Sequence, residues 1–169
     1  MGFLRGIVHF LTYFVYILIL VYGLLCLPVI VGYKPLVVLT GSMEPTYPVG
    51  SIVYYHSAAE SSLRVGDVIT FTYNDLTITH RIAEIHEDKY VTKGDSNNAA
   101  DPVPITFKNI LGKVGNVYVP YLGYYVRFVN EHLYIVGVAV FILVSEFLLN
   151  TVKAFDINKK RKDEKNGLQ

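Results

Sequence analysis

The chain has little cysteine and little net charge, and both shortages exclude classes of protein. Its 169 residues include one cysteine, Cys26, so a single chain can form neither a disulfide framework nor a thiolate metal cluster. Fifteen Lys and Arg against fourteen Asp and Glu give a net charge of +1, which offers no electrostatic basis for binding nucleic acid. Stability must come from the packing of one compact domain, which is all that this length allows.

The longest apolar run covers residues 7–31, and its only strongly polar member is His9. About 25 residues at roughly 1.5 Å per residue exceed the thickness of a bilayer core. The run ends near Pro28 and Gly32 without the A-x-A pattern of a signal-peptide cleavage site. We therefore predict a retained transmembrane signal anchor over residues 1–32.

A second apolar run, residues 133–149, is about the minimum spanning length, so it either crosses the membrane or forms a buried or interfacial helix. We predict a second transmembrane helix over residues 132–152. Arg5 precedes the first run, and six Lys and Arg lie in the tail 153–169, which places both ends in the cytoplasm by the positive-inside rule. The tail is expected to be a disordered, solvated end. Residues 33–131 would then form an extracytoplasmic domain.

Apolar and polar residues alternate between the two runs, which predicts a mainly β domain. Strands are expected at residues 51–56, 67–73, 76–80, 90–92 and 113–119. Asn74-Asp75 and Glu87-Asp88 separate alternating runs as hairpin turns do. The predicted fold is a β domain anchored by one N-terminal and one C-terminal transmembrane helix.

A candidate nucleophile, Ser42, lies about ten residues beyond the first apolar run. Gly41 and Pro45 shape a turn that could hold its hydroxyl exposed, although Gly-Ser followed by Pro is also an ordinary loop. A nucleophilic serine needs a general base, and a histidine with a pKa near roughly 6.5 suits neutral pH.

Five histidines could serve as that base. His80 lies late in a predicted strand and is the best candidate, although a lone histidine is more often structural. We place His9 and His132 in or beside the membrane segments, and we interpret His56 and His86 as surface residues at strand ends.

A third group should orient the imidazole of such a base. Residues 92–102 hold two carboxylates, Asp95 and Asp101, beside Gly94 and two Asn. The same composition fits a calcium-binding loop or a turn without further role, so spacing alone does not decide between these readings.

Four phrases, in this order, resemble the motifs of type I signal peptidases: VVLTGSMEP at 37–45, VGDVI at 65–69, THRI at 79–82 and TKGDSNN at 92–98, with Asp101 following. Because the third phrase contains a histidine, the chain resembles the Ser-His branch of that family, which is found in the endoplasmic reticulum, in archaea and in some Gram-positive bacteria. The chain has Thr40 and Ser51 where the family often has Ser and Asp. Neither departure removes a member of the triad.

The resemblance implies a β catalytic domain of the signal-peptidase type and a membrane-bound serine endopeptidase that removes signal peptides. It implies Ser42 as nucleophile, His80 as general base and Asp101 as the third member, with Asp95 also needed. The hydroxyl of Thr40 and the backbone N–H of Ser42 would support the oxyanion. No metal and no organic cofactor are implied.

The implied partners are secretory precursors with signal peptides and the lipid membrane, close to the translocon. That membrane would be the plasma membrane of a bacterium or archaeon, or the endoplasmic reticulum of a eukaryote. Two alternatives remain open: a self-cleaving regulatory protease on a related scaffold, and a non-catalytic, membrane-tethered β module that binds signal peptides or a peptidase partner.

The two aspartates are expected to differ in role. We expect Asp101 to accept the N–H of His80 and to stabilise the imidazolium. Asp95 follows Gly94 in a turn, and we expect its carboxylate to hold the loop by accepting backbone N–H groups.

Overall fold

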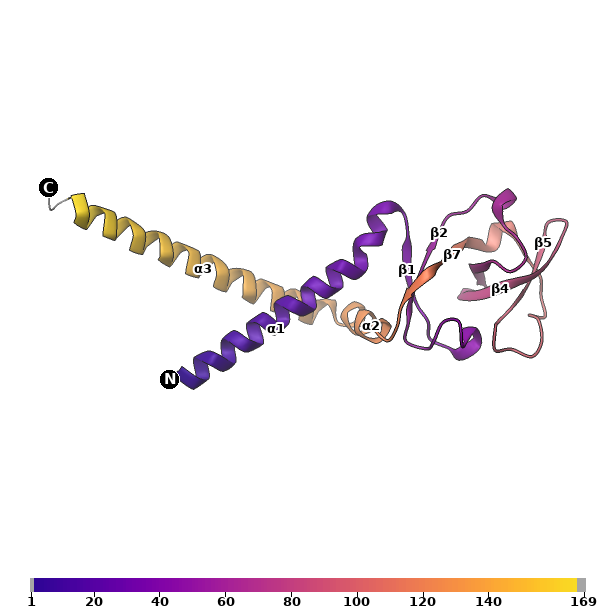
Figure 1. Ribbon diagram of the computed structural model, residues 1–169, viewed down its shortest axis with the longest axis horizontal. Helices are drawn as coiled ribbons and strands as arrows, with labels where there is room; N and C mark the ends of the chain where they lie inside the picture. Colours follow the sequence, from indigo (N-terminus) through magenta and orange to yellow (C-terminus); the bar gives the residue numbers. More distant parts are fainter. Residues whose placement is uncertain (1, 167–169) are drawn as a thin grey trace. The chain divides into compact units, whose positions relative to one another are not determined.

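The computed structural model describes residues 2–166 and divides the chain into two compact units, Val15–Phe128 and the two chain ends. The first unit contains a seven-stranded antiparallel sheet in the order β1-β2-β7-β3-β4-β5-β6 (Figure 1). The strands are β1 (Lys34–Val37), β2 (Ile52–His56), β3 (Val68–Tyr73), β4 (Leu76–His86), β5 (Lys89–Lys93), β6 (Ile105–Thr106) and β7 (Ile110–Val119). The predicted mainly β class is confirmed.

The sheet contains two strands that the alternation did not predict, β1 and β6, and β4 runs six residues beyond the predicted end at His80. Strand β1 was missed because it contains Pro35, which cannot donate a ladder hydrogen bond. The position of β1 at one edge of the sheet tolerates this proline. Strand β6 has only two residues, too few to show alternation.

The predicted hairpin between β3 and β4 is confirmed. Asn74 and Asp75 both have positive φ, 49° and 61°, as a two-residue turn of the favoured twist requires. This turn sets the register of the pair, in which Ile69 lies opposite His80. The side chains of Leu76, Ile78 and His80 therefore share one face of β4.

The end of helix α1 (Gly2–Cys26) packs against the sheet within the first unit. Leu25 is buried together with Ile52, Tyr54 and Val126, the last from helix α2 (Gly123–Glu131). The hydroxyl of buried Tyr54 donates to the carbonyl of Leu25 at 2.9 Å, so this buried polar group has a hydrogen-bond partner. The sheet thus packs directly against the last turn of the apolar helix.

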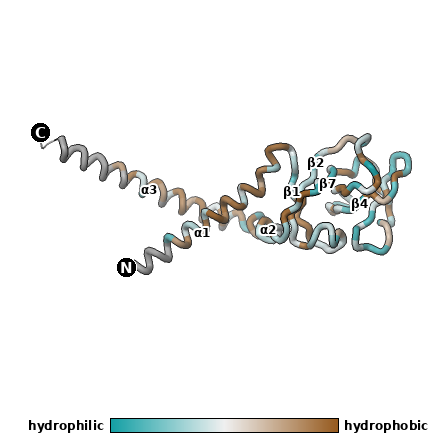
Figure 2. Tube along the Cα trace, in the orientation of Figure 1, coloured by the Kyte–Doolittle hydropathy of each residue, from teal (hydrophilic) through white to brown (hydrophobic). Residues whose placement is uncertain are grey.

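One helical segment of the described chain, His9–Val31, is by itself long and apolar enough to cross a membrane. Figure 2 shows the corresponding hydrophobic colouring along α1. Helix α2 and residues Val136–Val152 pass the same test only when they are taken together as one broken span. The second transmembrane helix therefore stays a prediction.

The charged tail differs from expectation. Helix α3 runs over Leu133–Asn166 and includes most of the segment predicted to be disordered, while residues 167–169 lie outside the described residues. Lys, Arg and Glu are good helix formers, and neither Pro nor Gly interrupts the tail before Gly167. High charge alone therefore did not justify the prediction of disorder.

Two glycines of β7 provide a test of the sheet packing. A Cβ on Gly112 would lie 2.2 Å from the backbone oxygen of His56, whereas one on Gly115 would lie 3.8 Å from its nearest neighbour, the carbonyl of Tyr54. We expect Gly112→Ala to destabilise the fold by about 1–3 kcal/mol, because β2 and β7 must separate to admit the methyl group.

The matched control is Gly115→Ala, which should change stability by less than about 1 kcal/mol. Chemical denaturation in detergent measures both variants. Equal effects of the two substitutions would contradict the packing described for β7.

Candidate active site

Ser42 lies in a short 3-10 turn, Gly41–Met43, that follows edge strand β1. Met43 is buried in the core with Val38 and Tyr47, so the turn is anchored directly beside the serine. Ser42 itself is half-buried, and its Oγ lies 3.3 Å from the Oγ1 of Thr40. The serine hydroxyl therefore sits on a fixed turn and faces a second hydroxyl.

His80 is 8% exposed and lies in β4, where its ring makes an edge-on contact with Phe71. Its Nδ1 lies 2.7 Å from the Oδ2 of Asp101. An ionised carboxylate can only accept, so Nδ1 carries the proton in this pair and Nε2 of a neutral ring is left as an acceptor. The same Asp101 oxygen accepts the hydroxyl of Thr92 at 2.6 Å, which fixes the carboxylate in place.

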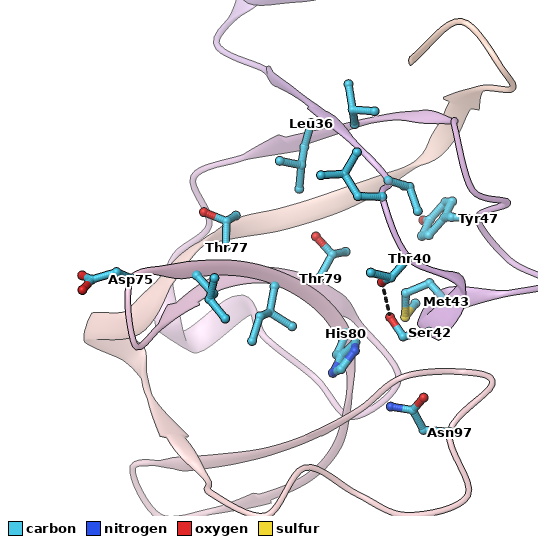
Figure 3. Close-up of a pocket in the computed structure, with 15 residues that line it drawn as sticks. Leu36, Thr40, Ser42, Met43, Tyr47, Asp75, Thr77, Thr79, His80 and Asn97 are labelled. Carbon is cyan, nitrogen blue, oxygen red and sulfur yellow. Dashed lines mark hydrogen bonds between the residues drawn. The ribbon is translucent and has the colours of Figure 1, made fainter. Parts of the chain in front are cut away.

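Ser42 and His80 line one groove of about 590 Å³. One wall consists of residues 36–40, which are mostly apolar, and the other of residues 75–80, where Leu76 and Ile78 alternate with threonines. The surface of the groove as a whole is mostly apolar. Figure 3 shows the His80 ring beside Ser42 at one end of this groove, with Thr40 next to the serine. The structure thus brings the predicted nucleophile and the predicted base to the same place.

The segment after β5 approaches the serine turn closely. The backbone N–H of Ser96 donates to the carbonyl of Ser42 at 3.0 Å, and the Ser96 hydroxyl donates to the carbonyl of Gly41 at 2.7 Å. A Cβ on Gly94 would lie 2.6 Å from the Ser42 carbonyl oxygen. Only glycine allows this approach.

Asp95 does hold its segment, but through partners different from those expected. Its carboxylate forms a two-point ion pair with Arg81, at 2.8 Å to Nε and 2.7 Å to the terminal nitrogen. It also accepts the hydroxyl of Thr46. The expectation of backbone N–H donors is wrong, because the side chains of Arg81 and Thr46 occupy the carboxylate. In the sequence, the only sign that Arg81 belongs to the site is that it directly follows His80.

The Arg81 guanidinium holds the pKa of Asp95 below its ordinary value, and the Thr46 hydroxyl adds to this against the opposing effect of burial. Asp95 is therefore a charged anchor between β4, the segment after β5 and the residues that follow the serine turn. The structure separates it from Asp101, whose carboxylate faces His80.

The remaining histidines lie elsewhere. His86 is exposed and pairs with Glu84, as expected of a surface residue. The interpretation of His56 as a surface residue is wrong. His56 is half-buried, its ring lies 5.0 Å from that of Tyr33, and its Nδ1 is buried. Across residues 2–166, the His, Cys, Asp and Glu side chains that are described form no group of three placed to hold a metal.

No family model matches the chain. Signal peptidase I W of Bacillus subtilis is 39% identical to it over 89 residues, which cover 49% of this chain and 47% of that protein. The signal peptidase complex catalytic subunit SEC11 of Zygosaccharomyces rouxii is 38% identical over 114 residues, 58% of this chain and 66% of the relative. These two curated homologues of the chain are therefore a signal peptidase and a signal peptidase catalytic subunit.

The human catalytic subunit SEC11C is 29% identical over 110 residues, and these cover 57% of either chain. The matched region spans between about half and two thirds of the length of these three relatives. Homology to signal peptidases therefore covers part of the chain, with the share differing between relatives.

The Asp95 ion pair gives a prediction for stability against pH. The pKa of Asp95 in the folded protein lies below its ordinary value of 3.8. The ion pair therefore stabilises the fold fully above pH 3.8, and this stabilisation is lost as the pH falls through the lower pKa of the folded state. Asp95→Ala should therefore lower the melting temperature at neutral pH, and its difference from wild type should shrink in acid.

Thermal unfolding in detergent, followed from about pH 7 downwards, measures this difference. Asp88→Ala is the matched control, because it removes an exposed carboxylate from a turn of the same sheet. A wild-type advantage over Asp95→Ala that stayed constant into strong acid would show that the charge of Asp95 is not the source of the stability.

Proposed function

We propose that this chain is a membrane-bound serine endopeptidase that removes signal peptides from secretory precursors. The observation that carries the proposal is the groove in which Ser42 and His80 meet, with Asp101 bound to the far side of the imidazole. Homology to signal peptidases supports the same activity. A non-catalytic module that only binds peptides would not need Ser42, His80 and Asp101 to lie together.

Ser42 attacks the carbonyl carbon of the scissile bond while the Nε2 of His80 takes its proton. Asp101 accepts the N–H of Nδ1, keeps the ring in the required tautomer and stabilises the imidazolium that forms. His80 then protonates the leaving amine, and water hydrolyses the acyl-enzyme with His80 again as the base.

The oxyanion of the tetrahedral intermediate needs donors that are already in position. We assign this role to the backbone N–H of Ser42 and to the hydroxyl of Thr40, which lies 3.3 Å from the Ser42 hydroxyl. Anchoring of the turn by buried Met43 supports the assignment, because donors that do not reorganise are the most effective.

The proposed setting is a membrane. The apolar segment His9–Val31 would cross the bilayer, and residues 33–131 would face the extracytoplasmic side, with a second span at 132–152 and the tail 153–169 in the cytoplasm. A signal peptide is itself held in the bilayer by its apolar core, so enzyme and substrate meet at one depth. Proximity to the translocon would follow from this supply of substrate.

Removal of either reacting side chain tests the activity. Ser42→Ala and His80→Ala should each abolish cleavage of a synthetic precursor in detergent, because the members of such a triad act as a unit. Both variants should keep the wild-type melting temperature to within a few degrees. Near-wild-type turnover by either variant would overturn the catalytic role assigned to that residue. Failure of the wild type to cleave any precursor would instead favour the peptide-binding module.

The two aspartates give a second test. Asp101→Asn should lower turnover by about 10⁴-fold, because the amide no longer supports the required tautomer or the imidazolium. Asp95→Asn should retain far more activity, since it lies in the anchor with Arg81 rather than on His80. Turnover and melting temperature are measured for both. A dead but stable Asp95→Asn beside an active Asp101→Asn would reverse these roles.

A further inference from the structure

We propose that the side-chain amide of Asn97 binds the substrate backbone directly beyond the scissile bond, on the side that becomes the new N-terminus. This inference rests on the proposed peptidase function and assigns a residue that recognises the leaving half of the substrate. Asn97 lies outside the triad and outside the oxyanion donors.

Asn97 is placed firmly at the reacting end of the groove. It is one of the groove-lining residues, together with Ser42 and His80. A Cβ on Gly94 would lie 2.8 Å from the Nδ2 of Asn97 and 2.6 Å from the carbonyl oxygen of Ser42, so these two atoms flank the same point. The backbone N–H of Asn97 donates to the Gly94 carbonyl at 3.0 Å, which fixes the turn that presents the side chain.

The amide of Asn97 also lacks a partner where its neighbours have one. Thr92, Asp95, Ser96 and Asp101 all use their side chains in hydrogen bonds that hold the segment together. Among the described residues, the half-buried amide of Asn97 has no such bond. An amide can donate to a carbonyl and accept from an N–H at once, which matches the two polar groups of a peptide backbone.

The two walls of the groove indicate which half of the substrate Asn97 meets. Residues 36–40 and 75–80 both lead along the chain towards the reacting pair, so the apolar groove lies on one side of Ser42 and His80. Figure 3 shows Asn97 on the other side of that pair, away from Leu36 and Thr77. The apolar groove suits the signal-peptide half, and Asn97 is left to the leaving half.

The test compares two substrates with the same acyl half. One is an internally quenched peptide that continues for several residues beyond the cut, and the other is a p-nitroanilide that has no peptide group there. Asn97→Ala in the full chain in detergent should lower kcat/KM about tenfold on the long peptide, as the loss of one hydrogen bond to substrate does. On the anilide, kcat/KM should stay within about twofold of wild type.

The ratio of the two kcat/KM values is the decisive number, because the fraction of correctly folded enzyme cancels from it. Asn98→Ala is the matched control: it truncates an exposed neighbour that does not line the groove, and it should leave both values unchanged. Equal losses on the two substrates, or no loss on either, would overturn the role of Asn97. Failure of wild type to cleave the long peptide would instead overturn the proposed function.

Discussion

The candidate site depends on the close approach of Gly94 to the carbonyl of Ser42. A single methyl group at Gly94 would come within 2.6 Å of that oxygen, so the approach exists only because the residue has no side chain. The two hydrogen bonds from Ser96 to the serine turn are made across the same contact. This contact holds the segment that carries Asp95 and Asp101 against the turn that carries Ser42.

In β4, the adjacent side chains of His80 and Arg81 have different partners. His80 and Arg81 are successive residues of one strand and therefore point to opposite faces. His80 faces the groove and Asp101, whereas Arg81 binds Asp95. The carboxylate of Asp95 also accepts the hydroxyl of Thr46, which follows the serine turn. One strand thereby separates the proposed proton transfer from structural support, although both use an Asp from the same short segment.

The packing of the first unit joins the sheet to the end of the apolar helix. Strand β1 begins three residues after the candidate span His9–Val31, and Tyr54 binds the carbonyl of Leu25. Ser42 follows the end of β1 by five residues. In the chain, Ser42 therefore lies eleven residues after the candidate span.

The sequence by itself determined the β class, the β3–β4 hairpin and the apolar helix, because period-two alternation, a two-residue turn and a long apolar run are local signals. It also supplied Ser42, His80 and both aspartates as candidates. Only the tertiary structure decided which carboxylate meets His80, because residues 80 and 101 come together through the pairing of β4 with β5. Arg81, Thr46, Ser96 and Asn97 acquire their places in the same way: each contacts residues distant in the chain, and no local pattern of residues encodes such a contact.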